Sequence, residues 1–335
     1  MFMIGGTGLL GSAAARELIA RGHEVCSMAL PPLPEGADLP PEMKIELGNA
    51  AELSDSELRK RFTGCEGFVF AAGVDERVEG PPPIYDFFKK HNIDALERLL
   101  RIAKESGVKK TAICGSYFSY FSKENPELEL TKWHPYIRSR IDQEDMALKF
   151  ADENFSVGIL QLPYIFGTQP GRKPVWVFLV EMIQGMKGVT MYPGGGTTMI
   201  TVRQAGQAIA GALEKTQGGK RWPIGYYNMP WKEFLKIVHK HMGMPNRKVL
   251  TIPKWVLNLG SKQMAKERKA KGIEGGLDMI KFSDIQCSCT FIDKELGCLP
   301  LGVAPDDIER AIGESVKLSL DILRGKTEAI GMKGE

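Results

Sequence analysis

Glycines near the start of the chain are the first residues whose type and spacing could do chemistry. Residues 5–11 read GGTGLLG, and the apolar segment Met1–Ile4 precedes them. Because glycine has no Cβ, this spacing lets the backbone turn sharply from a strand into a helix and approach a bound group closely. The free amides and the dipole at the start of that helix attract an anion such as a pyrophosphate. The loop therefore predicts a dinucleotide-binding site.

The end of the next predicted strand bears on the choice between NAD and NADP. The segment Glu24–Leu30 ends in Ala29 and Leu30, where dinucleotide folds usually carry a carboxylate for a ribose 2′-hydroxyl or an arginine for a 2′-phosphate. Neither residue type is present, which argues against a dedicated 2′-phosphate clamp. Glu35 or Asp38 in the following loop could reach the ribose, so NAD and NADP both stay open.

Alternating apolar runs and helical patterns must position this loop. The predicted strands are Met1–Ile4, Glu24–Leu30, Lys44–Leu47, Gly67–Ala72, Lys110–Cys114 and Ser156–Leu162, and the helices between them are Gly8–Arg21, Asp86–Ser106 and Tyr136–Phe150. Such alternation is typical of strand–helix–strand units with a parallel sheet. We therefore expect an α/β fold with a Rossmann-type, doubly wound parallel sheet.

The second half of the chain has a different character. After about residue 168, helices dominate, over Val175–Met186, Gln204–Thr216, Trp231–Met242, Ile252–Lys271 and Pro305–Arg324. We expect an NAD(P)-binding core over residues 1–167 and a smaller, mostly helical substrate-binding lobe over 168–324. This lobe is expected to be discontinuous and could return strands to the core. Residues 325–335 are expected to form a polar, frayed tail.

Several short motifs follow one another in a characteristic order. After the glycine loop come Ala71-Ala72-Gly73 at a strand end, Asn92 in the next helix, Gly115-Ser116 after a strand, Tyr136-x-x-x-Arg140, and LPYIFG at 162–167. Their order resembles that of the extended short-chain dehydrogenase/reductase family, also called the NAD-dependent epimerase/dehydratase family. IDKELG at 292–297 extends the resemblance over most of the chain. It implies an NAD(P)-dependent oxidoreductase or epimerase that transfers a hydride at a carbinol or carbonyl carbon of a small molecule.

The resemblance also implies roles for single residues. Tyr136 is implied as the general acid/base and Ser116 as its hydroxyl partner, with Ser119 as the substitute if the loop register differs. A tyrosine with a pKa of about 10 is a poor base at neutral pH, and an adjacent cation favours its phenolate. The implied cofactor contacts are Gly5, Thr7, Gly8, Leu9, Leu10, Gly11, Ala29, Asn49, Ala71, Ala72, Gly73, Tyr136, Arg140 and Pro163.

Arg140 departs from the pattern of the family, which has a lysine at this position. A guanidinium keeps the positive charge and can bind ribose hydroxyls, but it is essentially never deprotonated and cannot pass on a proton. We expect Arg140 to replace the lysine electrostatically and to act with Ser116 and Tyr136 in an active site. The alternative is a non-catalytic NAD(P)-binding regulator or scaffold.

The substrate is expected between the strand ends and the second lobe. The predicted pocket residues are Tyr164, Phe166, Arg172 and Trp176. Their aromatic rings suggest an apolar or mixed pocket, and Arg172 could meet a phosphate or carboxylate. Ordinary packing of the lobe is the alternative for each of them.

Composition excludes several classes of protein. The 335 residues include 44 Lys and Arg against 41 Asp and Glu, so the net charge of +3 gives no reason to expect nucleic acid. Apolar stretches are too short for a membrane span, no signal peptide is visible, and six sparse cysteines without a nearby histidine suggest reduced thiols and no metal. We therefore expect a cytoplasmic protein and leave a homodimer open.

A basic amphipathic helix is a further feature of the second half. Lys254–Lys271 combines lysines with Trp255 and Leu259. Such a helix can lie on an anionic membrane surface, although a surface helix with one buried face is the commoner case.

Overall fold

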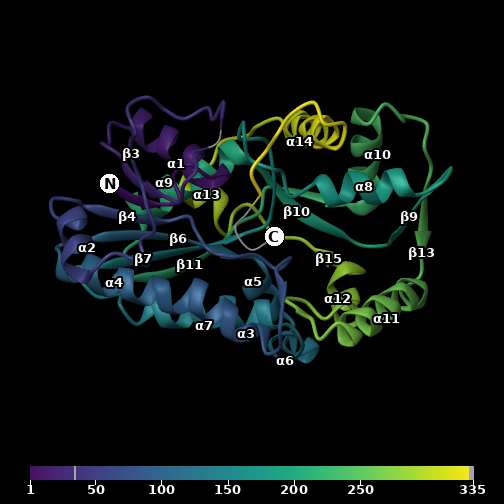
Figure 1. Ribbon diagram of the computed structural model, residues 1–335, viewed down its shortest axis with the longest axis horizontal. Helices are drawn as coiled ribbons and strands as arrows, with labels where there is room; N and C mark the ends of the chain where they lie inside the picture. The colour runs from purple at the N-terminus through teal and green to yellow at the C-terminus, as the bar shows by residue number, and fades with distance from the viewer. Residues whose placement is uncertain (34, 332–335) are drawn as a thin grey trace.

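Seven parallel strands form the central sheet of the computed structural model, which describes residues 1–33 and 35–331 (Figure 1). They lie in the order β11-β7-β6-β4-β1-β2-β3. Their bounds are β1 (Phe2–Ile4), β2 (Cys26–Ala29), β3 (Lys44–Leu47), β4 (Gly67–Phe70), β6 (Lys110–Ser116), β7 (Ser156–Leu162) and β11 (Gly219–Pro223). Each neighbouring pair is parallel. The predicted Rossmann-type α/β fold is therefore confirmed.

Helices cover both faces of this sheet. One face packs against α1 (Leu9–Ala20) and α9 (Val202–Lys215). The other packs against α2 (Asp55–Phe62), α4 (Ala95–Glu105) and α7 (Pro135–Leu148). Strands buried on both faces read as continuous apolar runs, which is why Gly67–Phe70 lacks a polar alternation.

The predicted helix over Asp86–Ser106 is interrupted in the structure. It divides into α3 (Ile84–Phe88), a π-helical segment (Lys89–Asp94) and α4. Asn92 is fully buried in the π-helical segment, where its side chain accepts a hydrogen bond from the amide of Val74 at 2.9 Å and donates one to the Val74 carbonyl at 3.1 Å. The widened turn therefore ties this helix to the segment that follows β4. Such bulges are frequent at functional sites.

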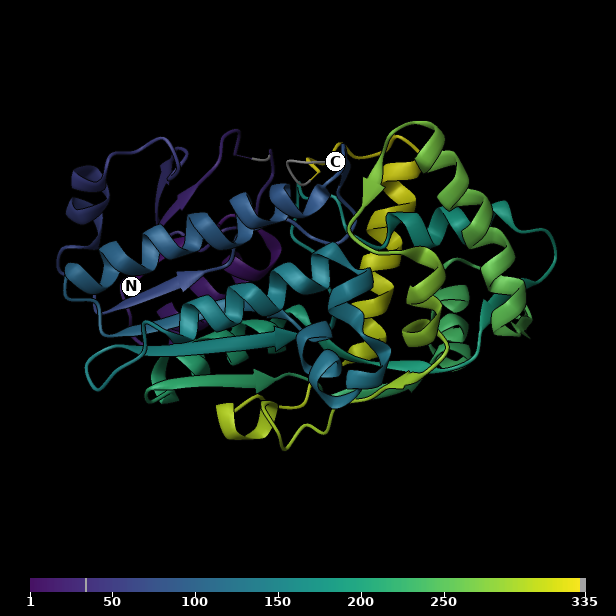
Figure 2. The same cartoon turned by 90° about the horizontal axis from the view of Figure 1, so that it is seen from below.

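A second lobe lies beside the sheet, as Figure 1 and the turned view in Figure 2 show. Its strands are β8 (Tyr164–Phe166), β9 (Thr190–Pro193), β10 (Gly196–Thr201), β12 (Tyr227–Pro230), β13 (Val249–Ile252) and β15 (Cys289–Thr290). Its helices are α8 (Val177–Gly185), α10 (Trp231–His241), α11 (Lys254–Ala270), α12 (Met279–Gln286) and α14 (Ile308–Leu323). The lobe has its own core, built on aromatic and aliphatic side chains of β8, α8, α10 and α14.

The two parts exchange chain segments. α9 packs closely on α1, since an added Cβ at Gly206 would lie 2.6 Å from the carbonyl oxygen of Ala13. β11 then adds to the sheet beside β7. Residues 202–223 are thus part of the unit built on the seven-stranded sheet, although the chain before and after them builds the second lobe. Shorter elements complete the fold, namely α5 (Phe118–Glu124), α6 (Leu130–Trp133), α13 (Cys298–Leu301), β5 (Glu79–Gly80), β14 (Glu274–Gly275) and a 3₁₀ turn (Pro126–Leu128).

The polar tail is partly anchored rather than frayed. Ile330 forms a parallel bridge with Arg172, because its amide donates to Gly171 at 2.9 Å and its carbonyl accepts from Lys173 at 3.0 Å. The part of the tail over 332–335 lies outside the described residues. Among the helices of the described chain, none combines the length and the hydropathy that crossing a bilayer requires.

Candidate active site

The glycine loop connects β1 to α1 as the spacing predicts. Gly5 has a φ of +91°, and an added Cβ there would lie 2.6 Å from the carbonyl oxygen of Ala71. An added Cβ at Gly11 would lie 2.2 Å from the carbonyl oxygen of Gly5. Gly8 caps α1 without a side-chain hydrogen bond, and no acidic residue stands in the first turn. The first amides of α1, including those of Leu9 and Leu10, are thus left for an anion, and the loop fits a pyrophosphate.

Arg172 lies against this loop and not in a separate pocket. Its Nη2 donates to the Thr7 hydroxyl at 3.0 Å, and its Nε contacts the Thr7 carbonyl oxygen at 3.5 Å. Thr7 is buried. Arg172 is half-buried, and this burial lowers the pKa of its guanidinium. No described carboxylate forms an ion pair with Arg172. Arg172 of the second lobe therefore places a positive charge without an ion-pair partner next to the start of α1.

The remaining predicted cofactor contacts lie at the carboxyl ends of the strands. Ala29 ends β2, Ala71, Ala72 and Gly73 follow β4, and Pro163 joins β7 to β8. Asn49 follows β3, but its amide is engaged locally, since it donates to Glu52 at 2.8 Å and accepts from the amide of Ala51 at 3.1 Å. An adenine contact from Asn49 would have to replace these bonds.

Ser116 and Tyr136 come from adjacent elements. Ser116 ends β6, is buried, and accepts a hydrogen bond from the amide of Phe118 at 3.4 Å. Tyr136 stands in the first turn of α7, which proline at position 135 starts, and is 4% exposed. Its amide donates to the carbonyl of Gly276 at 3.0 Å, so a segment of the second lobe fixes the start of this helix. Ser119 is buried in α5, and its hydroxyl oxygen has no hydrogen-bond partner among the described residues.

Arg140 lies one helical turn after Tyr136. Its guanidinium carbon is 5.2 Å from the centroid of the Tyr136 ring. Nη1 donates to Gln143 at 2.9 Å, and Nη2 donates to the Val74 carbonyl at 3.2 Å. Nε is buried without a hydrogen-bond partner. Because buried polar atoms are normally satisfied, this orphaned donor beside Gly73 fits a bound acceptor such as a ribose hydroxyl.

Glu76 was not predicted from the sequence, and its charge acts on the same site. Glu76 follows β4, and Gly276 lies between it and Tyr136, since an added Cβ there would be 2.8 Å from the Glu76 carbonyl oxygen and 3.1 Å from the Tyr136 Cβ. Burial and the neighbouring Asp75 raise the pKa of the Glu76 carboxyl well above its usual range. Burial raises the pKa of the Tyr136 phenol, Arg140 opposes this, and Glu76 adds to it. The charges of Arg140 and Glu76 therefore act in opposite directions on the pKa of the phenol.

Contacts that were not predicted from the sequence also hold part of the second lobe against the site. β14 pairs with β5 in an antiparallel arrangement, and the Glu274 carboxylate accepts from the amide of Ile84 at 2.7 Å. The amide of Asp278 donates to Nδ1 of His134 at 3.1 Å. His134 is fully buried two residues before Tyr136, and burial lowers its pKa to about 4. These bonds hold the second lobe to the start of α7.

The predicted pocket residues fall into different surroundings. Phe166 and Trp176 stack on each other at 4.2 Å inside the core of the second lobe, and the Trp176 indole donates to the Ile165 carbonyl at 2.9 Å. The Tyr164 ring lies 5.9 Å from that of Tyr117, the residue after Ser116. Burial raises the pKa of Tyr164 well above its usual value. Among the predicted pocket residues, Tyr164 is thus the one that belongs to the second lobe and also lies next to the neighbour of Ser116.

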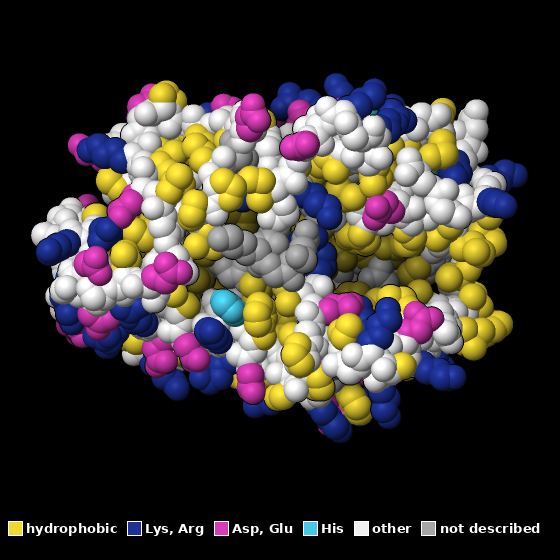
Figure 3. All heavy atoms as spheres, viewed as in Figure 1, with side chains coloured by type: hydrophobic (Ala, Val, Ile, Leu, Met, Phe, Trp, Pro, Cys, Tyr) yellow, Lys and Arg dark blue, Asp and Glu magenta, His cyan; other side chains and the backbone are white. Residues whose placement is uncertain are grey.

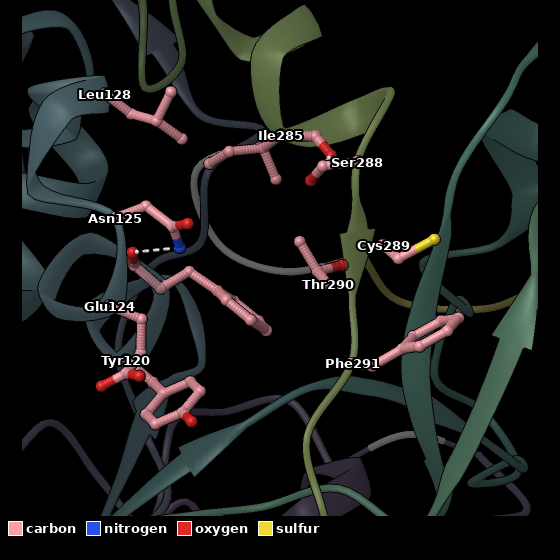
Figure 4. A pocket seen from close by; sticks show the side chains of 10 residues that line it. Tyr120, Glu124, Asn125, Leu128, Ile285, Ser288, Cys289, Thr290 and Phe291 are labelled. Atoms are coloured by element: carbon pink, nitrogen blue, oxygen red, sulfur yellow. Dashed lines mark hydrogen bonds between the residues drawn. The ribbon is translucent and has the colours of Figure 1, made fainter.

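A cavity of about 260 Å³ lies beside this aromatic path, between α5 and β15 (Figure 4). Thr290 lines it and donates to the Thr197 hydroxyl at 3.1 Å, which in turn lies 3.1 Å from the Tyr117 hydroxyl. Tyr120 and Phe291 border it from opposite sides.

A parallel sheet whose first strand leads through a glycine loop into a helix is the arrangement of dinucleotide-binding proteins of the Rossmann type. The chain belongs to the NAD dependent epimerase/dehydratase family, whose sequence pattern matches residues 1–225. This confirms the resemblance and the expected nicotinamide cofactor.

Three individual proteins are similar to the chain at low sequence identity. A sterol-4-alpha-carboxylate 3-dehydrogenase (decarboxylating) from Dictyostelium discoideum is 22% identical over 240 residues, which are 64% of this chain and 67% of that protein. The crystal structure of gox2253 has a TM-score of 0.71 at 20% identity, over 98% of this chain and 99% of that one. A UDP-N-acetylglucosamine 4-epimerase from Methanobrevibacter ruminantium M1 has a TM-score of 0.64 at 16% identity, over 96% and 98%. Likeness at this level establishes the fold and leaves the substrate open.

Proposed function

We propose that the protein is an NAD(P)-dependent oxidoreductase or epimerase that acts at a carbinol or carbonyl carbon of a small molecule, with Tyr136 as general acid/base. The single observation that supports this most is the placement of Arg140 one turn from Tyr136, with a buried and unpartnered Nε. The bound cofactor would supply or accept the hydride.

The glycine loop and the strand ends would hold the cofactor. The amides of the first turn of α1 and the guanidinium of Arg172 would bind the pyrophosphate, and Arg140 would bind a ribose hydroxyl through Nε. Gly73 supports this placement, because an added Cβ there would lie 2.7 Å from the Asn92 side-chain oxygen and in contact with the guanidinium nitrogens of Arg140 at 3.7 Å.

Tyr136 would move the proton, and Ser116 would hold the substrate oxygen. In the reduction, the phenol donates to the developing alkoxide; in the oxidation, the phenolate accepts the proton of the hydroxyl group. Arg140 favours the phenolate, while burial and Glu76 disfavour it. The phenolate is therefore populated at lower pH when the charge of Glu76 is neutralised.

The test is a comparison of wild type with Tyr136→Phe against a panel of secondary alcohols, ketones and nucleotide sugars with NAD and NADP. We expect the wild type to show turnover with at least one of them, and Tyr136→Phe to lose it by at least about a hundredfold while NAD still raises its melting temperature. A Phe variant with unchanged turnover would contradict the role of Tyr136.

The alternative of a non-catalytic, NAD(P)-binding regulator is supported by one observation. Arg140 is already bound by Gln143 and Val74, which could hold it in a purely structural place. Cofactor-dependent stabilisation of the wild type, without turnover of any compound in the panel, would favour this alternative.

A further inference from the structure

The outward face of α11 is a surface that the proposed function does not use. Within this 17-residue helix, Ser261 is the only buried residue. Trp255 and Leu259 lie on the side turned away from Ser261, and they are 66% and 58% exposed. Lys262 and Lys266 continue the same stripe, because residues three and four positions apart share a helix face. The stripe is therefore apolar in its first half and basic in its second half.

A neighbouring strand pair extends the apolar half. β9 and β13 are paired so that Met191 lies beside Leu250, and these side chains are 47% and 54% exposed. β13 runs through Pro253 directly into α11. Figure 3 shows apolar side chains gathered at this end of the molecule, where Figure 1 places β9, β13 and the start of α11. Solvent-exposed apolar residues that cluster in this way mark an interaction surface.

The charge of this helix is strongly one-sided. Residues 254–271 contain six basic residues and a single acidic one. Two of the basic residues, Lys254 and Arg268, are paired within the protein. Lys262, Lys266 and Lys269 form no ion pair with any carboxylate in the described chain. Their charges therefore face solvent next to the apolar residues.

A groove of about 360 Å³ follows the basic half of the helix. Lys269 of α11 lines it together with Trp133 and Met279. Lys132 and Lys281 lie over the Trp133 ring at 4.9 and 4.4 Å, so further cations surround the groove. Both carboxylates at the groove, those of Glu274 and Asp278, accept hydrogen bonds from backbone amides of the protein.

We propose that Met191, Leu250, Trp255, Leu259, Lys262, Lys266 and Lys269, called here the α11 surface, dock this protein onto an anionic lipid bilayer. Apolar residues enter the boundary between headgroups and acyl chains, where a tryptophan ring is well accommodated. The lysines meet the negative headgroups, and each one near such a surface strengthens binding about fivefold. The binding is peripheral and reversible, because it involves side chains of one helix and one strand pair.

Charge decides between a bilayer and a second copy of the chain. In a symmetric dimer through this face, the same patch would meet itself, and the unpaired lysines of both copies would be brought together. Such like-charge contact is unfavourable in a desolvated interface. A bilayer with anionic lipids instead offers both an apolar phase and the complementary charge.

The experiment is co-sedimentation of the full chain with vesicles of phosphatidylcholine alone or mixed equally with phosphatidylserine, at low and high salt. We expect binding to the mixed vesicles only, at least tenfold weaker at high salt. Trp255→Glu combined with Leu259→Glu should abolish it, and Lys262→Gln, Lys266→Gln and Lys269→Gln together should weaken it at least tenfold. Fluorescence of Trp255 should shift to the blue on binding, and Trp255→Phe should lose that shift.

Matched variants exclude a general effect of charge or polarity. Leu296→Glu with Leu299→Glu changes two exposed leucines elsewhere, and Lys109→Gln, Lys123→Gln and Lys149→Gln remove three exposed lysines elsewhere. Both should bind like wild type, and all variants should keep the NAD-dependent melting temperature. Equal binding to both vesicle types, binding that the α11 substitutions leave unchanged, or self-association through α11 without lipid would each overturn the proposal.

Discussion

Arg140 and Tyr136 share one face of α7, with the Arg140 guanidinium 5.2 Å from the centroid of the Tyr136 ring. Glu76, which follows β4, exerts the opposite influence on the pKa of the phenol. Burial raises the pKa of this phenol, and two residues from different elements then change it in opposite directions, so that the effect of each can be tested separately.

Arg140→Gln tests the cation. Loss of the guanidinium removes the charge that lowers the pKa of Tyr136, so the phenolate becomes rarer at neutral pH. A rise of one pKa unit reduces the phenolate about tenfold. We expect kcat for the oxidation direction to fall by at least that factor at pH 7, and its pH profile to move to higher pH. Arg140→Lys, which keeps the charge, should retain most of the activity, and an unshifted profile in Arg140→Gln would contradict the electrostatic role.

Glu76→Gln should shift the profile in the opposite direction. Removal of the carboxylate removes a charge that raises the pKa of Tyr136, so the basic form should become available at lower pH. The check is the pH dependence of kcat/KM, with Glu97→Gln on the exposed side of α4 as the control. If Glu76→Gln and Glu97→Gln have the same profile, Glu76 does not act on the phenol.

Arg172→Gln separates cofactor binding from substrate binding. Because Arg172 lies on Thr7 of the glycine loop, we expect the variant to bind NAD about tenfold or more weakly, as is usual for the loss of a charge-assisted hydrogen bond. Binding of adenosine, which has no phosphate, should be unchanged, and so should the KM of the substrate. An increased substrate KM with normal NAD affinity would show instead that Arg172 acts in the substrate pocket, as its sequence position suggested.

Gly11→Ala should disable the loop by sterics alone. The added methyl would lie 2.2 Å from the Gly5 carbonyl oxygen and 2.6 Å from the Gly6 Cα, and these are backbone atoms that cannot swing away as the end of a side chain can. We expect no rise of the melting temperature with NAD. Gly185→Ala in α8 is the matched control, because nothing lies within 4 Å of its added Cβ.

Local sequence was sufficient for the features that depend on neighbours along the chain. The glycine loop, the six sheet strands expected over residues 1–167 and the placement of a cation one turn after a tyrosine all follow from patterns within a few residues. The interrupted helix was missed, because the π-helical segment is stabilised by the contact of Asn92 with Val74, 18 residues earlier.

Contacts between the second lobe and the rest of the chain could not be predicted from the sequence. Arg172 approaches Thr7 across 165 residues, and Asp278 meets His134 across 144. Phe166 and Trp176 have the composition of a pocket wall, yet they stack inside the lobe. A residue type alone does not distinguish a packed aromatic from one that faces a ligand.

His134 makes the contact between the lobes sensitive to acid. Its pKa falls from 6.5 in the unfolded chain to about 4 in the folded protein, because burial disfavours the charged ring. Above pH 6.5 the ring is neutral in both states and the full stability is present. As the pH falls from 6.5 toward 4, only the unfolded chain takes up the proton, so the free energy of unfolding decreases by about 1.4 kcal/mol per pH unit from this group. His134→Asn keeps an acceptor for the amide of Asp278 but does not titrate, so chemical denaturation should give a shallower dependence on pH in this range. Above pH 7 the slopes of wild type and variant should coincide, and equal slopes below pH 6 would show that His134 is accessible to protons in the folded protein.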